Sequence, residues 1–189
     1  MARLPYLQQA DLAPEDRDLL GGTVPLEGKI PDLYRVLAHA PKAMRKLNAF
    51  AMHIRHDSKL DPRLRELAIL QVGYSAKSRY EYSHHIKLGL QFGVTEDDIR
   101  AIALETAGKP STLDPLAKLV LRAAREMTDN IALSDATFAA LHREFDNELL
   151  LELVLAIAQY NAVVRILGTF QIDVEGPYLQ YLEKFPLPQ

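Results

Sequence analysis

Apolar residues recur at steps of three and four along most of this sequence, and the alternation typical of a strand is almost missing. The longest apolar stretch, Leu149 to Leu167, is interrupted by polar residues, which indicates a buried helix. We therefore predict an all-α fold, a bundle of helices. The expected helices cover residues 14–20, 31–38, 41–56, 61–74, 77–92, 95–106, 114–128, 134–144 and 147–168.

Capping residues mark several of these boundaries. Asp61 followed by Pro62 predicts a helix start, because an aspartate N-cap accepts from the first turn and proline fits the first helical position. Thr95, followed by three acidic residues, predicts another start. Gly93 is expected to end the helix over 77–92, since glycine readily adopts the left-handed conformation found after helices.

Prolines and glycines divide the chain into three parts. Residues 1–29 are expected to form an N-terminal arm that wraps a neighbouring subunit or stays solvated. Residues 30–175 form the predicted helical domain, and residues 176–189 a C-terminal tail.

Two leucine-rich stretches of the sequence resemble each other. Glu66 lies eight residues before Tyr74, and Glu152 lies eight residues before Tyr160, each in a similar pattern of leucines. The match indicates two related helical units, with chance similarity as the alternative. Only the first unit is followed by a Glu–His pair.

Composition narrows the classes of function. The chain has 189 residues, 48% of them hydrophobic, which suits one globular domain with a sizeable core. A net charge of −3 without basic clusters gives no reason to expect nucleic acid or membrane as a partner. The chain has no cysteine, which excludes disulfides and thiol chemistry, and no signal peptide is recognisable, so we expect a cytoplasmic protein.

The run from Ser78 to His85 concentrates side chains that can carry chemistry. On a helix, Ser78, Glu81 and His85 share one face, where they present a hydroxyl, a carboxylate and an imidazole. Glu66, twelve residues before Ser78, lies among apolar positions, where a carboxylate is costly unless it is paired. A surface Glu–His pair is the structural alternative, and His84 can simply pack, cap or face solvent.

A metal site is a further alternative. Glu66, Glu81 and His85 offer three ligands, but helical metal motifs usually supply two histidines or clearer carboxylate pairs, so we expect no metal. His53 and His56 most simply form a solvated helix end.

From Arg63 to Ile99, and again from Tyr160 to Leu167, the sequence resembles the carboxymuconolactone decarboxylase family, which includes the alkylhydroperoxidase D proteins. The resemblance covers roughly residues 30–175 and implies an all-α, alkylhydroperoxidase D-like fold that assembles as a homo-oligomer, a trimer or hexamer. In the hydroperoxidase branch, a glutamate precedes two cysteines and a histidine. By resemblance, Glu66 and His85 take the glutamate and histidine positions.

Ser78 and Glu81 stand where the two cysteines of the hydroperoxidases would be. Neither side chain can reduce a peroxide through a disulfide cycle, so we do not expect peroxidase activity. The decarboxylase branch implies instead a cofactor-free reaction on a small carboxylated lactone from aromatic-compound degradation.

That reaction needs a proton donor and a hold on the substrate carboxylate. We expect His85 to donate the proton, with Glu81 or Glu66 orienting it. The residues expected to bind substrate are Ser78, Arg79, Tyr80 and His84. Arg79 would hold the carboxylate, unless it is only a solvated charge. Related proton transfers, such as lactone isomerisation, and a non-catalytic binding or assembly protein are the alternatives.

Overall fold

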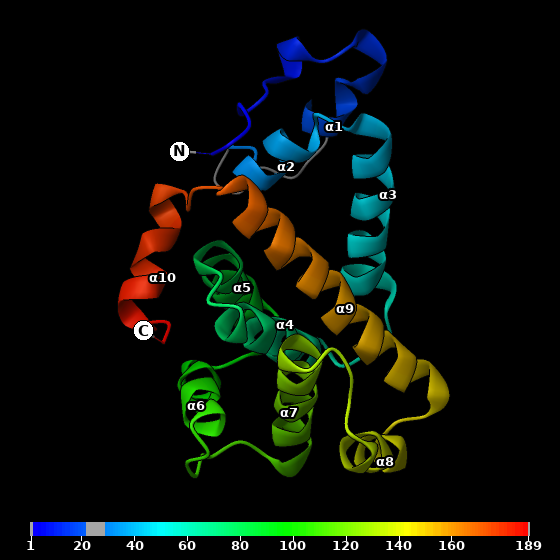
Figure 1. Cartoon of the computed structure of the whole chain (residues 1–189), viewed down its shortest axis with the longest axis vertical. Coiled ribbons are helices and arrows are strands. Elements are labelled where there is room, and N and C mark those ends of the chain that lie inside the picture. The colour runs from blue at the N-terminus through cyan, green and yellow to red at the C-terminus, as the bar shows by residue number, and fades with distance from the viewer. Residues whose placement is uncertain (1, 22–28, 189) are drawn as a thin grey trace.

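The computed structural model describes residues 2–21 and 29–188, and this part of the chain contains helices and no strand (Figure 1). The all-α prediction is therefore confirmed. The α-helices are α1 (Asp18–Gly21), α2 (Asp32–Leu37), α3 (Pro41–Met52), α4 (Pro62–Ser75), α5 (Arg79–Gln91), α6 (Glu96–Thr106), α7 (Pro115–Asp129), α8 (Asp135–Glu144), α9 (Asn147–Phe170) and α10 (Leu179–Lys184). Short 3-10 turns at Gln9–Asp11, Pro14–Asp16 and Gly176–Tyr178 and a π-helical turn at His53–Asp57 complete the elements.

Helix α4 is the centre of the molecule. Every residue from Leu64 to Tyr74 is buried, because α5, α7 and α9 pack around it. A helix enclosed in this way needs no polar face, which explains the nearly continuous apolar pattern of α4. The charged residues within it must therefore find their partners inside the protein.

The predicted caps hold the helix starts as expected. The Asp61 side chain accepts a hydrogen bond from the Leu64 amide at 3.0 Å. Thr95 and Asp98 form a capping box at the start of α6. Gly93 follows α5 with φ of +94°, the left-handed conformation that glycine adopts without strain.

Helices α4 and α5 approach each other closely at Gly73. A Cβ added there would meet the backbone nitrogen of Tyr82 at 3.1 Å and its Cα at 3.2 Å. The absence of a side chain at Gly73 thus lets the backbones of α4 and α5 come together. This contact brings the two helices with the candidate catalytic residues side by side.

The structure differs from the predictions at the end of α3 and in the C-terminal tail. Helix α3 ends at Met52, and the backbone continues as the π-helical turn, whereas the sequence predicted one helix to residue 56. The expected C-terminal tail contains α10, and Phe185, just after it, joins the main hydrophobic core. The isolated sequence of α10 is too short to predict a helix, because a six-residue helix depends on tertiary contacts.

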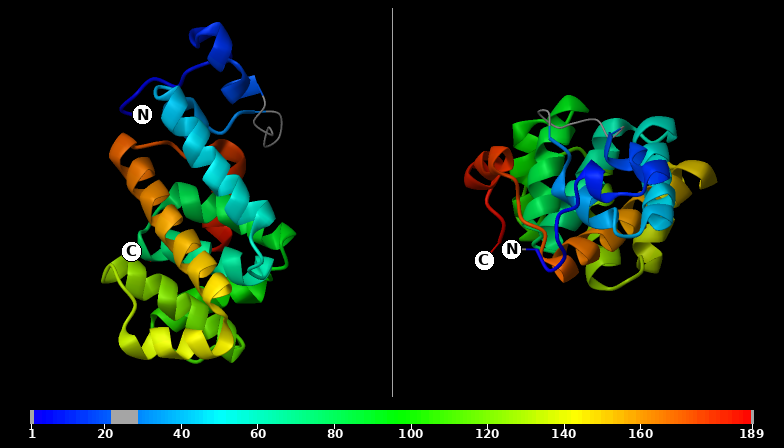
Figure 2. Two further views of the ribbon diagram at one scale, coloured as in Figure 1. Left: turned by 90° about the vertical axis from the view of Figure 1, so that its right-hand side faces the viewer. Right: turned by 90° about the horizontal axis from the view of Figure 1, so that it is seen from above.

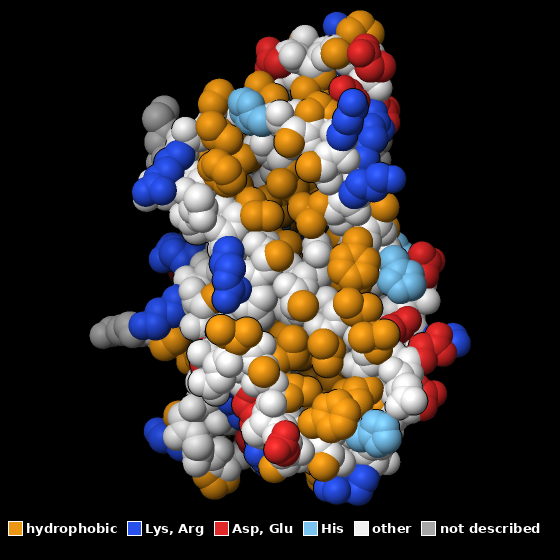
Figure 3. Space-filling view, turned by 45° about the vertical axis from the view of Figure 1, so that its right-hand side comes forward, with side chains coloured by type: hydrophobic (Ala, Val, Ile, Leu, Met, Phe, Trp, Pro, Cys, Tyr) orange, Lys and Arg blue, Asp and Glu red, His pale blue; other side chains and the backbone are white. Residues whose placement is uncertain are grey.

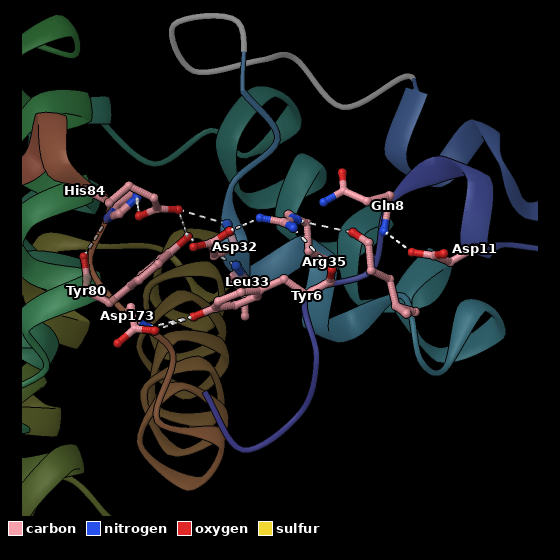
Figure 4. Close-up of polar contacts among 11 residues, drawn as sticks. Tyr6, Gln8, Asp11, Asp32, Leu33, Arg35, Tyr80, His84 and Asp173 are labelled. Atoms are coloured by element: carbon pink, nitrogen blue, oxygen red, sulfur yellow. Dashed lines mark hydrogen bonds and ion pairs between the residues drawn. The ribbon is translucent and has the colours of Figure 1, made fainter. Parts of the chain in front are cut away.

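The N-terminal segment docks on its own chain. The Arg3 amide donates to the Phe170 carbonyl at 2.8 Å, and the Tyr6 hydroxyl donates to Asp173 at 3.1 Å. Arg35 of α2 donates to the carbonyls of Leu7 and Tyr6 at 3.2 and 3.1 Å (Figure 4). Residues 22–28 of the predicted arm lie outside the described residues.

Helix α9 runs obliquely across the molecule (Figures 1 and 2). By length and composition alone it is apolar enough to cross a membrane, but half of its most apolar window is buried in the protein. Such burial is typical of a core helix.

On α8 and α9, Phe138, Leu151 and Leu155 remain exposed, and Figure 3 shows that apolar side chains are spread over one side of the molecule. Such a surface is compatible with the predicted homo-oligomer, which stays a prediction.

Candidate functional site

His85 of α5 lies between two carboxylates. Its Nδ1 is 2.7 Å from Glu66 Oε2 of α4, and its Nε2 is 3.0 Å from Glu81 Oε1, one turn earlier on α5. The three residues are almost completely buried, with 1%, 3% and 5% of Glu66, Glu81 and His85 exposed. The structure thus brings together the three predicted catalytic residues.

The two carboxylates keep His85 protonated. Burial by itself lowers the pKa of this imidazole, but the negative charges of Glu66 and Glu81 outweigh burial and raise it to about 9. Burial likewise raises the pKa of Glu66, yet His85 and Arg65 lower it below its usual value. At neutral pH the site therefore contains an imidazolium with an N–H directed to each side.

Glu81 is the incompletely bonded member of the site. Its Oε1 is at ion-pair distance from His85 Nε2 but accepts no well-aligned hydrogen bond from a described residue, although it is sealed from solvent. Buried polar atoms are usually hydrogen-bonded, so an exception of this kind needs an explanation. Glu81 Oε1 has a lone pair that can accept a further hydrogen bond.

Arg65 connects the site to the π-helical turn. Its Nε and Nη2 each lie 3.2 Å from Glu66 Oε1, and its Nη1 donates to the Arg55 carbonyl at 3.0 Å. Its guanidinium also covers the ring of Phe92, with 4.7 Å to the ring centre. Arg65 therefore neutralises Glu66 and fixes the backbone of the turn beside it.

Two tyrosines and Arg55 surround the same site. The Tyr160 ring of α9 meets the His85 ring edge to face, with 4.8 Å between ring centres. Burial, followed by the charges of Glu66 and Glu81, raises the pKa of Tyr160 far above its usual value. Tyr34 of α2 is partly buried, and burial, with the charge of Glu81, raises its pKa as well. No local sequence pattern groups these residues, because they lie far apart along the chain.

The geometry does not favour a metal at His85. The two carboxylates take opposite nitrogens of one imidazole, so the three side chains do not converge on one point. Within residues 2–21 and 29–188, no group of three or more His, Asp or Glu residues is arranged to hold a metal ion.

His84 belongs to a separate cluster. Its ring is stacked between Tyr80 and Tyr178, with ring centres 3.9 and 3.6 Å away, and its Nε2 is 3.0 Å from Glu175 Oε2. Glu175 Oε1 in turn accepts from the Tyr80 hydroxyl at 3.1 Å (Figure 4). The predicted substrate-binding residues Tyr80 and His84 thus hold the C-terminal segment against α5.

Ser78 and Arg79 lie at the N-terminus of α5. Ser78 is the N-cap residue and precedes the helix that the sequence predicted to include it, and its side chain makes no capping hydrogen bond. Arg79 is exposed and lines a surface groove of about 320 Å³ with Lys77 and residues of the C-terminal segment. The expectation that Arg79 holds a carboxylate beside His85 therefore has no support in its position.

Glu152, the counterpart of Glu66 in the second predicted unit, has a different environment. It accepts from the Lys59 amide at 2.9 Å and from the Ser58 hydroxyl, and its Oε1 is 3.8 Å from His53. A pocket of about 10 Å³, the size of one water molecule, lies beside these residues. Glu152 thus closes the loop after the π-helical turn, and the duplication stays a prediction.

The helical bundle, with a glutamate of α4 hydrogen-bonded to a histidine of α5, defines an alkylhydroperoxidase D-like protein without cysteines. Residues 41–126 match the family model of the carboxymuconolactone decarboxylase family. This match confirms the resemblance to the family over residues 41–126. No curated protein matches the sequence.

Solved structures share the fold over almost the whole chain. An uncharacterized peroxidase-related protein with an alkylhydroperoxidase AhpD core, from Ralstonia eutropha JMP134, is 17% identical, with a TM-score of 0.80 over 99% of this chain and 98% of its own. The debrominase Bmp8, solved with 2,3,4-tribromopyrrole, is 17% identical, with a TM-score of 0.82 over 98% of this chain and 100% of its own. A putative antioxidant defence protein from Agrobacterium tumefaciens is 19% identical, with a TM-score of 0.64 over 74% and 95%. At these identities the likeness establishes the fold alone.

Proposed function

We propose that this protein is an acid/base enzyme that decarboxylates, or transfers a proton on, a small carboxylated or lactone compound. The observation that carries the proposal is the buried imidazolium of His85 between Glu66 and Glu81. The match of residues 41–126 to the carboxymuconolactone decarboxylase family supports the reaction class. Without cysteine, the thiol–disulfide cycle of peroxide reduction is not open to this chain.

The site has the parts that protonation of a carbanion needs. Decarboxylation breaks the bond to the carboxyl carbon, releases carbon dioxide and leaves an electron pair on the neighbouring carbon. His85 Nε2 would deliver the proton to that carbon, directly or through Glu81, and water would restore it. Glu66 keeps the imidazole oriented through Nδ1, and its charge stabilises the protonated form.

Deuterium incorporation during turnover tests this proposal. In deuterated water, a carboxylated lactone should give product with one deuterium at the former carboxyl-bearing carbon. His85→Gln should lower kcat by about a hundredfold to ten-thousandfold, the usual contribution of a general acid. His142→Gln is the matched control, because His142 is exposed on α8 and touches only Asn147 among the described polar groups.

A non-catalytic binding protein is the second candidate. It is favoured by the burial and mutual bonding of Glu66 and His85, and by the position of the two pockets described above, neither of which they line. If the wild type turns over no carboxylated lactone while binding one, or if His85→Gln is as active as the wild type, this candidate replaces the enzyme.

A further inference from the structure

Arg55 is a cation beside the site without a carboxylate of its own. Among the described residues it forms no ion pair, whereas its neighbour Arg65 pairs with Glu66. Arg55 lies in the π-helical turn, and the hydrogen bond from Arg65 Nη1 to its carbonyl fixes this turn against the site. π-helical turns are rare in proteins, and those that occur often lie at functional sites.

Two phenolic hydroxyls accompany Arg55. Arg55 donates a hydrogen bond to the Tyr160 hydroxyl, which leaves the O–H of Tyr160 available as a donor. The Tyr34 hydroxyl makes no hydrogen bond to another described group. Burial lowers the pKa of Arg55, but Tyr160, Tyr34 and then Glu66 raise it above its usual value, which places all three close to its guanidinium. The three donors come from α2, the π-helical turn and α9, and they meet beside His85.

We propose that Arg55, with the hydroxyls of Tyr160 and Tyr34, binds the carboxylate of the substrate. This inference rests on the proposed function and names the group that the substrate must carry. The guanidinium offers two parallel N–H groups, the geometry that a carboxylate matches best. The two phenol hydroxyls are uncharged donors, so they add hydrogen bonds without changing the net charge of the site. A carboxylate held here lies next to Glu81 and His85, where the proton is needed.

Charge supports a carboxylate over a neutral ligand. The charges of Arg65 and Glu66 offset each other, as do those of His85 and Glu81, so the positive charge of Arg55 remains. One anionic group would bring the site to neutrality. Arg79, the residue that the sequence favoured for this role, is exposed at the groove beside the C-terminal segment.

Benzoate and its uncharged analogue benzamide test the subsite independently of turnover. Calorimetric titration should detect benzoate binding to the wild type and none of benzamide. Arg55→Gln should weaken benzoate binding about tenfold to a hundredfold, the loss expected for a charge-assisted hydrogen bond. Arg55→Lys should recover part of the affinity, and Tyr160→Phe should lose a smaller part. Arg79→Gln, the matched control, should bind as the wild type does.

The outcomes separate the subsite from the reaction. Binding that disappears in Arg55→Gln but persists in Arg79→Gln supports the subsite, whether or not turnover is found. Unchanged binding in a folded Arg55→Gln, or no benzoate binding by the wild type, overturns it. If Arg55→Gln does not fold, equal benzoate affinity of Tyr160→Phe, Arg55→Lys and the wild type overturns it as well. Loss of deuterium incorporation in His85→Gln bears only on the proposed function.

Discussion

His84 and His85 are neighbours on one helix, yet they belong to different regions of the molecule. His85 faces α4, and Glu66 of α4 and Glu81 of α5 hold it as an imidazolium in the core. His84 faces the C-terminal segment, where two tyrosine rings and Glu175 enclose it. Consecutive helical residues point about 100° apart, so one step along the chain separates two environments.

Burial alone does not identify a catalytic histidine. Both rings are buried, and both meet a glutamate. Each cluster also contains buried polar atoms without a well-aligned hydrogen bond, Glu81 Oε1 in one and His84 Nε2 and Glu175 Oε2 in the other. The His84 cluster joins α5 to segments far away in the sequence and fills its space with aromatic stacking (Figure 4). The His85 cluster differs because two carboxylates meet one imidazole and because Arg55, which forms no ion pair among the described residues, lies beside it.

The largest effect should come from Glu66→Gln. This change leaves Arg65 without its counter-charge in the core, and breaking a buried ion pair from one side costs about 3 to 5 kcal/mol. Urea unfolding should show this loss. Glu148→Gln, which removes an exposed partner of Lys59, should cost less than about 1 kcal/mol. Equal losses in the two variants would contradict the buried charge network.

The pH dependence of stability should depend on His85. The folded pKa of His85, about 9, lies above the ordinary value of 6.5 for an imidazole, so its stabilisation is complete below pH 6.5 and disappears as the pH rises through 9. The shift corresponds to a loss on the order of 3 kcal/mol. Unfolding free energies measured from pH 6 to pH 10 should therefore fall less in His85→Gln than in the wild type. An equally steep fall in the two proteins would contradict the raised pKa.

Gly73→Ala should disturb the His85 region selectively. The added methyl group meets the backbone of Tyr82, which cannot move without separating α4 from α5. We expect a loss of about 1 to 3 kcal/mol, the usual cost of overpacking, and a lower NMR-measured pKa of His85 as Glu66 moves away. Gly168→Ala is the control, because nothing lies within 4 Å of its added Cβ. An unchanged His85 pKa would show that the contact does not set the Glu66 distance.

Glu175→Gln should have the smallest effect on stability, and the effect should be confined to the C-terminal segment. It weakens the contacts to His84 and Tyr80, at a cost of about 1 to 2 kcal/mol. Amide hydrogen exchange should increase in α10 while the protection of α4 stays the same. Glu183→Gln, an exposed change on α10 itself, should leave the exchange unaltered. Faster exchange throughout α4 would show that the two clusters are not independent.

Local patterns were sufficient for the helices and for the position of the acid/base residues. The caps at Asp61 and Thr95 depend on neighbours within one turn, and the structure has the predicted hydrogen bonds. Glu66 in an apolar pattern signalled a paired carboxylate, and the pair is present. By contrast, Arg55 and Tyr160 carry no local signal, because they are more than one hundred residues apart in the sequence.

The amino-acid sequence was enough to predict the all-α fold, the family resemblance, the absence of thiol chemistry and the Glu66–His85 framework. Each of these follows from residue types and from spacings of a few residues. The packing of the helices shows which histidine meets two carboxylates, that Arg79 lies apart from them, and that Arg55 and two tyrosines lie beside them. Those features depend on how the helices pack, and packing depends on contacts between distant segments that no single stretch of sequence encodes.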